Sequence, residues 1–361
     1  MKIKVGILGA TGSVGQRFIQ LLAEHPWFEI SYIAASPRSA GKKYQDAVAG
    51  RWLMPEAIPE NVKNMTIEDA SQIDKATGRC SIMFSAVNMP KAAIRKLEMA
   101  YAEKGFAVVS NNSAHRHTED VPVLIPEINP RHLDIITLQR KKYNWDKGLI
   151  VVKPNCSVQS YLTPIYALLE SGYSVDKLII TTLQALSGAG YPGPSGLDII
   201  DNVVPYIDGE EKKSEIEPRK ILGDIKNGKF EYNDSIDISA HCNRVPVIDG
   251  HIVCASMHFK NEIPDKEEII RIWQDFKGAP QELELPMAPA QPIIYQTEKD
   301  RPQPRKDRNN DKGMAVTVGR LRECNVFDYR FVGLSHNTIR GAAGGGILNA
   351  EYLVEKGYIK Q

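Results

Sequence analysis

The sequence predicts an α/β protein in which a parallel sheet with helices on both faces comes first and an α+β unit with a mostly antiparallel sheet follows. Strand-like apolar runs alternate with helical segments over residues 1–150, which is the pattern of a parallel sheet. From about residue 176, longer strand candidates with fewer helices between them indicate the second unit. The 361 residues are 42% hydrophobic and supply apolar material for a core in each unit.

The first unit opens with a strand, a turn, a helix and a second strand. Residues 2–8 (KIKVGIL) form an apolar strand, residues 16–24 have helical apolar spacing, and residues 28–35 (FEISYIAA) form the next strand. The alternation continues in three further segments, the strands 81–86 and 107–110 and the helix 91–104 between them. We therefore expect a parallel sheet whose helices pack on both faces.

The second unit is predicted from longer apolar runs. These are strand candidates at residues 178–185, 236–239, 251–258 and 314–320, with a helical segment at 266–276. A mostly antiparallel sheet of this kind needs one face covered by helices or by another subunit. Residues 287–312 are rich in proline and charge, and we expect an irregular loop there. The alternative for this loop is a subunit contact or a rim over the active site.

Charge and cysteine content exclude several classes of protein. The net charge of +1 gives no reason to expect a nucleic acid or an anionic membrane as a partner. No apolar run approaches the roughly 18 residues that span a bilayer. The five cysteines are scattered and form no C-x-x-C pair, which argues against a disulfide framework and against a metal site. We expect a cytoplasmic protein that holds no metal.

A glycine-rich turn joins the first strand to the first helix. Gly9, Gly12 and Gly15 allow a tight turn and a close approach of the backbone to a pyrophosphate, whose charge then faces the helix N-terminus. The spacing is G-x-x-G-x-x-G rather than G-x-G-x-x-G, and a turn that only permits helix–sheet packing is the alternative. We predict a Rossmann-type dinucleotide site. Its expected contacts are Gly9, Thr11, Gly12, Ser13 and Val14.

The end of the second strand indicates which dinucleotide is bound. NAD sites usually carry Asp or Glu there to hold the ribose 2′-hydroxyl. This chain has Ser36, Arg38 and Ser39 instead, with no carboxylate among them. Hydroxyl and guanidinium donors suit a dianionic 2′-phosphate. The sequence therefore predicts NADP as the cofactor.

Cys156, in the segment KPNCSVQ, is the predicted nucleophile. An apolar run at residues 148–152 precedes it and a helix-like stretch at 161–169 follows, so we expect it at a strand-to-helix junction. The partial positive charge of a helix N-terminus stabilises a thiolate by about 0.3–1 kcal/mol. The alternative is a small buried cysteine that only packs. A reactive thiol beside a hydride carrier indicates redox chemistry through an acyl thioester.

Four segments together resemble one family. KPNCSVQ at residues 153–159, LQALSGAGYPG at 183–193, NRVPVIDGH at 243–251 and SHNTIRGAAGG at 335–345 occur in this order. They resemble aspartate-semialdehyde dehydrogenase, and their residues are more similar to the archaeal and fungal branch of that family than to the common bacterial one. The resemblance extends over essentially the whole chain.

The resemblance implies roles for the residues around the thiol. Cys156 would form the acyl-enzyme, and Gln184 would orient the substrate beside it. Arg244 would bind the substrate α-carboxylate, for which a planar bidentate fork is suited. His251 would be the general acid/base, and an imidazole that titrates near neutrality suits that task. A histidine that only begins a strand is the alternative for His251.

Further residues are implied at the phosphate, the amine and the cofactor. Arg116 would bind phosphate, and an E-x-x-K pair, Glu210 and Lys213, would meet the ammonium and the phosphate or carboxylate. The register of this pair is ambiguous because Glu211 and Lys212 adjoin it, and a solvated helix face is the alternative. Around the nicotinamide we expect contacts from Ser187, Gly188 and Asn337.

The implied activity is the NADP-dependent reductive dephosphorylation of L-aspartyl-4-phosphate to L-aspartate 4-semialdehyde, in biosynthesis of lysine, threonine, methionine and isoleucine. A malonyl-CoA reductase of the same fold and a non-catalytic NADP-binding sensor are the alternatives. We expect residues 1–155 with 337–361 to form the NADP-binding domain, because a helix at 347–356 returns to it. Residues 156–336 would form the catalytic and dimerisation domain of a homodimer or homotetramer.

Overall fold

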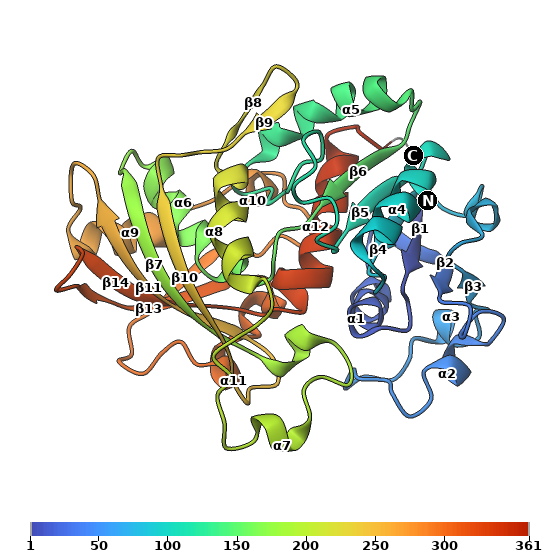
Figure 1. Cartoon of the computed structure of the whole chain (residues 1–361), viewed down its shortest axis with the longest axis horizontal. Coiled ribbons are helices and arrows are strands. Elements are labelled where there is room, and N and C mark those ends of the chain that lie inside the picture. Colours follow the sequence, from blue (N-terminus) through green and yellow to red (C-terminus); the bar gives the residue numbers. More distant parts are fainter. Residues whose placement is uncertain (1, 360–361) are drawn as a thin grey trace.

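The computed structural model describes residues 2–359 and builds them around two large sheets (Figure 1). The first sheet has six strands in the order β3-β2-β1-β4-β5-β6, and every pairing in it is parallel. Its strands are β1 Ile3–Leu8, β2 Phe28–Ala35, β3 Glu68–Asp69, β4 Ile82–Ser85, β5 Ala107–Ser110 and β6 Leu149–Val152. The predicted Rossmann-type parallel sheet is confirmed.

Helices cover both faces of this sheet because its strands are apolar on both sides. Met83 points to the core that contains Ile94 of α4, whereas Phe84 points to the core that contains Phe18 of α1 and Ile347 of α12. The helices of this unit are α1 Ser13–Leu22, α4 Lys91–Glu103, α5 Ile135–Tyr143 and α12 Gly344–Glu355. The last of these packs on α1 and β5, so the expected return of the chain is present (Figure 1).

The second sheet has six strands in the order β10-β7-β11-β14-β13-β12. The three central pairings are antiparallel, and the outer pairs β10/β7 and β13/β12 are parallel. Its strands are β7 Val175–Gln184, β10 Asp237–Arg244, β11 His251–Phe259, β12 Ile293–Gln296, β13 Val316–Glu323 and β14 Tyr329–Ser335. The predicted mostly antiparallel sheet is confirmed, although β14 was not among the predicted strands.

From its prolines and charges we had predicted an irregular loop at residues 287–312. Part of this segment instead forms regular secondary structure. It contributes the edge strand β12, in which Ile293 pairs with Val316, and a short helix, α11 Pro304–Asp307. Ile293 is fully buried, so this part of the segment packs on the sheet through an apolar side chain.

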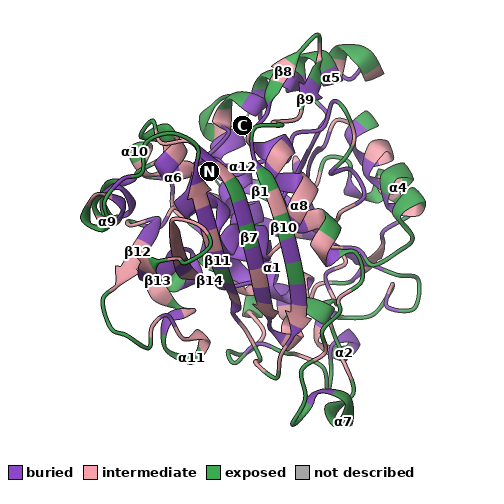
Figure 2. Cartoon of the chain, turned by 60° about the vertical axis from the view of Figure 1, so that its left-hand side comes forward, coloured by how far each residue is buried: buried purple, intermediate pink, exposed green. Residues whose placement is uncertain are grey.

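One face of the second sheet packs on α6 Leu162–Glu170 and α9 Lys266–Asp275, where the Trp273 indole donates to the Pro164 carbonyl at 2.9 Å. The opposite face carries exposed side chains such as Ile179 and Cys254. Burial alternates along β7 and β10 accordingly (Figure 2). Helix α8, Glu210–Ile221, packs beside β10.

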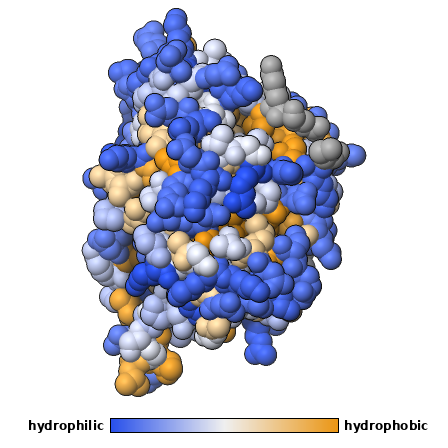
Figure 3. All heavy atoms as spheres, turned by 90° about the vertical axis from the view of Figure 1, so that its right-hand side faces the viewer, coloured by the Kyte–Doolittle hydropathy of each residue, from blue (hydrophilic) through white to orange (hydrophobic). Residues whose placement is uncertain are grey.

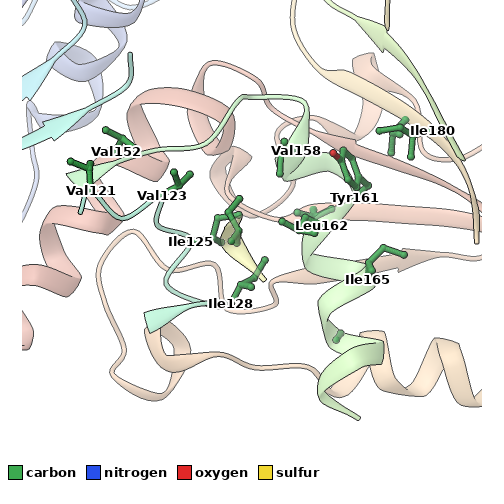
Figure 4. Close-up of a cluster of buried hydrophobic side chains, with 14 of the residues drawn as sticks. Val121, Val123, Ile125, Ile128, Val152, Val158, Tyr161, Leu162, Ile165 and Ile180 are labelled. Atoms are coloured by element: carbon green, nitrogen blue, oxygen red, sulfur yellow. The ribbon is translucent and has the colours of Figure 1, made fainter. Parts of the chain in front are cut away.

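The apolar core is continuous between the two units. Val152 at the end of β6 and Ile180 in β7 belong to one group of buried side chains, joined by Val158 and Leu162 (Figure 4). The segment that connects β6 to α6 therefore runs through the core, and it is held between the two sheets.

The remaining α-helices and strands of the described residues are short. They are α2 Tyr44–Ala47, α3 Glu60–Lys63, α7 Gly196–Ile199, α10 Ala279–Glu282 and the hairpin β8 Asp224–Lys226 with β9 Lys229–Glu231. Hydrophilic side chains cover most of the surface of the first unit in the view of Figure 3. Within residues 2–359, none of the helices has the length and apolar character needed to cross a membrane.

Candidate active site

A cleft of about 710 Å³ lies between the two units, where the ends of strands from both sheets meet. Most of the predicted site residues line it, namely Thr11, Gly12, Ser13, Val14, Arg116, Cys156, Gln184, Ser187, Gly188, Glu210, Arg244, His251 and Asn337. Five do not, namely Gly9, Ser36, Arg38, Ser39 and Lys213.

The glycine-rich turn is tight, as its sequence predicted. Gly9 has a φ of 81°, and a Cβ there would lie 2.4 Å from the Ala86 carbonyl oxygen. A Cβ on Gly15 would lie 2.2 Å from the Gly9 oxygen. Helix α1 then starts at Ser13 with no side-chain cap, so the N–H groups of its first turn are free to bind an anion in the cleft.

The turn after β2 adjoins the glycine-rich turn. The N–H groups of Gly9 and Ala10 both donate to the Ala34 carbonyl, at 2.8 and 3.1 Å. Ser36 and Arg38 follow two and four residues later and are exposed, whereas Ser39 is buried and its N–H donates to the Ser36 carbonyl at 2.9 Å. The Arg38 guanidinium is thus available beside the expected ribose site, and its contact with a 2′-phosphate stays a prediction.

Cys156 lies between β6 and α6, as predicted, but not at the N-terminus of the α-helix, where we had expected it. A single 3-10 turn, Val158–Ser160, follows it, and α6 starts only at Leu162. Burial, reinforced by the Glu210 carboxylate, raises the pKa of the Cys156 thiol to about 11. A helix dipole therefore does not activate this thiol, and its ionisation depends on the charged side chains around it.

His251 is the nearest titratable neighbour of the thiol. Its Nε2 lies 3.2 Å from Cys156 Sγ, and its Nδ1 accepts the N–H of Ala185 at 3.0 Å. A neutral ring with an accepting Nδ1 carries its proton on Nε2, directed at the sulfur. Burial and the adjacent Arg244 charge lower the pKa of His251 to about 3, so our expectation of titration near neutrality was wrong for the free protein.

Glu210 is a hub of hydrogen bonds at the base of the cleft. It accepts from Asn155 Nδ2 at 3.0 and 2.9 Å, from Gln184 Nε2 at 3.1 Å and from Lys213 Nζ at 2.6 Å. Burial alone would raise its pKa, but Lys213 and these hydrogen bonds outweigh burial and lower the pKa. Glu211 instead accepts the Cys242 N–H at 3.2 Å. Glu210 thus lines the cleft with Lys213 paired to it, whereas Glu211 does not line it, and the contact of this pair with substrate stays a prediction.

Arg244 ends β10 and enters the cleft beside the thiol. Its Nη1 donates to the Ala185 carbonyl at 2.6 Å, and no carboxylate within residues 2–359 forms an ion pair with it. A Cβ on Gly188 would lie 3.0 Å from Arg244 Nη1 and 3.1 Å from His251 Cε1. Glycine at 188 therefore lets the loop pass directly over both side chains.

Arg116 is held by three groups of the protein. It pairs with Glu217 at 2.9 Å, donates from Nε to the Lys153 carbonyl at 3.0 Å and from Nη2 to the Asn111 carbonyl at 3.2 Å. A guanidinium has five N–H donors, so two remain for an anion in the cleft.

Asn337 is engaged within the protein rather than free. Its Nδ2 donates to Ser187 Oγ at 2.8 Å, and its Oδ1 accepts the Gly250 N–H at 2.8 Å. This arrangement fixes the position of Ser187 at the cleft, while a direct contact of Asn337 with a nicotinamide stays a prediction.

Several residues of the site were not predicted. Glu217 lies on the buried face of α8 with Glu210 and Ser214, and the spacing i, i+4, i+7 of these polar residues could have indicated it. Thr338 and Gly341 also line the cleft; both lie in the segment SHNTIRGAAGG at 335–345, which could have indicated them. In the described chain no group of three or more His, Cys, Asp or Glu side chains is placed to hold a metal.

Comparisons with known proteins extend this description. Residues 4–136 match the family described as semialdehyde dehydrogenase, NAD binding domain, and residues 163–340 match its dimerisation domain. The aspartate-semialdehyde dehydrogenase of Schizosaccharomyces pombe is 44% identical over 98% of both chains, and that of Archaeoglobus fulgidus is 45% identical over 99% of both. A crystal structure of the Candida albicans enzyme with NADP has a TM-score of 0.89 and 42% identity, covering 99% of this chain and 100% of that chain.

Proposed function

The chain belongs to the aspartate-semialdehyde dehydrogenase family, and from this premise we propose that it reduces L-aspartyl-4-phosphate to L-aspartate 4-semialdehyde with NADPH. The observation that carries the proposal is the 3.2 Å approach of Cys156 Sγ and His251 Nε2 in a cleft that also contains Arg244 and the glycine-rich turn. Nucleophile, proton donor, carboxylate anchor and cofactor cradle thus open into one space.

The substrate is bound at two ends in this proposal. The free Arg244 guanidinium binds the α-carboxylate, and Glu210 receives the ammonium group. The two remaining donors of Arg116 bind the phosphoryl group. These contacts place the acyl carbon at Cys156 Sγ, so binding energy from the charged ends orients the reacting centre.

The reaction then divides into two steps. The Cys156 thiolate attacks the acyl carbon, phosphate leaves, and a thioester forms. Bound NADPH supplies the hydride for the second step. His251 Nε2–H donates its proton to the oxygen that becomes negatively charged and takes it back as the carbon–sulfur bond breaks, so that the aldehyde leaves and Cys156 is again a thiolate.

The residues present fit the cofactor. The uncapped start of α1 provides N–H groups for the pyrophosphate, and Gly9 and Gly15 permit its close approach. Ser36, Arg38 and Ser39 would receive the 2′-phosphate. The relatives named above favour this activity over a malonyl-CoA reductase and over a non-catalytic sensor.

The test compares acyl donors directly. NADP reduction by aspartate semialdehyde is measured with and without phosphate, and NADPH oxidation is measured with malonyl-CoA. We expect phosphate-dependent activity with the first substrate and none with the second. Activity with malonyl-CoA alone would assign the chain to the alternative reductase, and NADP binding without either activity would indicate a sensor.

We also propose domain boundaries, an oligomeric state and a biological role for the chain. We place the NADP-binding domain at residues 1–155 with 337–361, and the catalytic and dimerisation domain at 156–336. The exposed face of the second sheet around Ile179 and Cys254 supports a homodimer, or a homotetramer built from it. A cytoplasmic location and a role in lysine, threonine, methionine and isoleucine biosynthesis follow from the proposed activity.

Cofactor preference is expected to depend on Arg38. Replacing Arg38 with alanine should raise the KM for NADP about 10- to 100-fold, because a charge-assisted hydrogen bond contributes about 1.5–3 kcal/mol. Steady-state kinetics with each cofactor provide the measurement. The KM for NAD serves as the control and should not change; an equal rise for both cofactors would contradict the assignment of Arg38 to the 2′-phosphate.

Substrate affinity is expected to depend on the guanidinium shape of Arg244. Replacing Arg244 with lysine keeps the charge but removes the bidentate fork, so the KM for aspartate semialdehyde should rise roughly 100-fold. The matched control is Arg219→Lys on the half-exposed side of α8, where the guanidinium pairs with Asp234 outside the cleft. Kinetics in which both variants have the same KM would contradict the role of Arg244.

A further inference from the structure

The carboxylate of Glu217 bridges the candidate phosphate ligand and the nucleophile segment, residues 153–159. Its Oε1 accepts from Arg116 Nη1 at 2.9 Å, and its Oε2 accepts the Asn155 N–H at 2.6 Å. Glu217 is 2% exposed and does not line the cleft, whereas Arg116 and Asn155 both line it. Glu217 is therefore placed to act on the reaction through its two partners.

Helix α8 is bonded to the nucleophile segment on both sides of Cys156. Ser214 and Glu217 lie three residues apart and share a face of the helix. Ser214 Oγ lies 3.2 Å from Ser157 Oγ, and Glu217 accepts the N–H of Asn155. The backbone that carries the thiol is thus attached to α8 immediately before and immediately after Cys156.

The Arg116 guanidinium is held at each of its three nitrogens. Nε donates to the Lys153 carbonyl at 3.0 Å, Nη1 to Glu217 at 2.9 Å and Nη2 to the Asn111 carbonyl at 3.2 Å. A planar group held at three corners cannot rotate, so its remaining N–H donors have fixed directions. Two of the acceptors are neutral carbonyls, and a hydrogen bond to a carboxylate is stronger. Glu217 is therefore the strongest of the three anchors.

These contacts form a closed ring. Arg116 reaches the nucleophile segment directly at the Lys153 carbonyl, and it reaches the same segment through Glu217 at the Asn155 N–H. The ring contains two buried charges of opposite sign, each of which needs its partner. The position of the guanidinium relative to the thiol is thus determined by the protein before any substrate binds.

We propose that Glu217 is a positioning residue, which fixes the phosphate-binding guanidinium of Arg116 relative to the peptide that carries Cys156. The inference deepens the proposed function, because it rests on Arg116 as the phosphate ligand. In the oxidation of aspartate semialdehyde, phosphate must attack the acyl carbon while that carbon is bonded to sulfur. A guanidinium in fixed relation to the thiol aligns phosphate for this attack.

The charge of Glu217 would act in the opposite direction. A carboxylate paired with Arg116 lowers the positive potential that a phosphate dianion meets. If charge were its main effect, neutralising Glu217 would strengthen phosphate binding. If Glu217 positions Arg116, the same change weakens phosphate binding, so the two roles predict opposite signs.

Two variants separate the position of the carboxylate from its charge. Glu217→Gln keeps the size but has one acceptor and one donor, so it cannot accept from both Arg116 and Asn155. Glu217→Asp keeps the charge but is one methylene shorter. The matched control is Glu215→Gln, because Glu215 also lies on α8 and accepts a backbone N–H, that of Ala240 at 3.1 Å, outside the cleft.

The first readout is the KM for phosphate in the oxidation of aspartate semialdehyde, compared with the KM for NADP. We expect the KM for phosphate to rise about 10- to 100-fold in Glu217→Gln and at least about fivefold in Glu217→Asp, because small displacements of a binding group have effects of this size. The KM for NADP should change less than about twofold. Glu215→Gln should keep both constants.

Two results would overturn the proposal. One is a folded Glu217→Gln protein in which the KM for phosphate is unchanged or lowered, since Glu217 would then act by its charge or not at all. The other is a Glu217→Asp protein with the original KM for phosphate, since a carboxylate in the wrong position would then be sufficient.

A double variant tests whether Glu217 acts through Arg116. In an Arg116→Ala protein there is no guanidinium left to position, so adding Glu217→Gln should raise the KM for phosphate no further. If the effects of the two changes instead multiply, Glu217 influences phosphate by another route and the proposal is wrong.

Backbone hydrogen exchange provides a readout that needs no turnover. In Glu217→Gln and Glu217→Asp the Asn155 amide loses or lengthens its hydrogen bond, so peptides containing residues 153–159 should exchange one further amide at least about 10-fold faster. Glu215→Gln should exchange like the original protein. Identical exchange in all four proteins would reject the role of Glu217, and the aspartate variant provides both readouts if the glutamine variant does not fold.

Failure of the proposed function gives a different result from failure of this inference. Oxidation that does not depend on phosphate would refute the proposed function together with the phosphate role of Glu217, while exchange at Asn155 would still decide whether Glu217 holds the nucleophile segment. Phosphate-dependent oxidation with a KM that Glu217 does not influence would retain the proposed function and reject the inference.

Discussion

Replacing Cys156 with serine is expected to lower kcat by at least about 10⁴-fold while the affinity for NADP stays unchanged. The hydroxyl is a far weaker nucleophile than a thiolate, and neither a helix dipole nor a free imidazole lone pair is present to activate it. Steady-state kinetics in both directions provide kcat, and cofactor binding is measured by fluorescence titration.

The matched control is Cys324→Ser, because Cys324 follows β13 outside the cleft and is half-buried like Cys156. It should retain the kcat of the original protein. A Cys156→Ser protein that keeps more than about one hundredth of the activity would show that no acyl-enzyme is formed on this residue.

Changing His251 is expected to have the second-largest effect, and two variants separate its two nitrogens. His251→Asn can retain an acceptor for the Ala185 N–H but removes the Nε2 donor, and His251→Gln can place a donor near the sulfur. We expect kcat to fall about 10³- to 10⁴-fold in the first and about 10²-fold in the second, because general acid catalysis contributes about 10²–10⁴. The KM for aspartate semialdehyde should change little.

The pH profile provides the control for His251. Its pKa is lowered to about 3 in the free protein, so the imidazole stays neutral from pH 5 upward and loss of His251 should remove no inflection between pH 5 and 8. An inflection near pH 6.5 in the kcat/KM of the original protein that disappears in both variants would contradict the lowered pKa of His251.

The helices and strands were predictable wherever local patterns decide them. Alternating apolar strands and helices predicted β1 to β6, and the motifs around Gln184, Arg244 and His251 predicted side chains that do meet in one cleft. In each of these segments the apolar pattern or motif that allows the prediction lies within about ten residues. Hydrophobic periodicity is recognised over stretches of about this length.

Other features depend on partners far away in the sequence. The ion pair of Arg116 with Glu217 joins residues of the two units, and no local pattern indicates it. Burial and the Glu210 carboxylate raise the pKa of Cys156, and one segment packed against this residue is the π-helical turn Ile339–Ala343, almost two hundred positions later in the chain. Sequence alone therefore predicted a nucleophile at Cys156 but not the electrostatic surroundings of its thiol.

The helix predicted at residues 161–169 is present as α6, Leu162–Glu170, so only the inference that its N-terminus acts on Cys156 was wrong. Pro164 is tolerated only in the first turn of α6, because it lacks an N–H and clashes with the residue four positions earlier. The helix accordingly begins at Leu162. A proline eight residues after Cys156 thus already placed the helix N-terminus too far away to act on the thiol.

The position of α12 also determines when the first unit can complete its fold. Residues 344–353 are all buried, and they pack on α1 and β5. A nascent chain that has emerged only as far as the second sheet therefore exposes the apolar groove that α12 fills, and exposed surfaces of this kind recruit chaperones or aggregate. Synthesis must therefore pass residue 353 before the buried face of α12 can pack on α1 and β5.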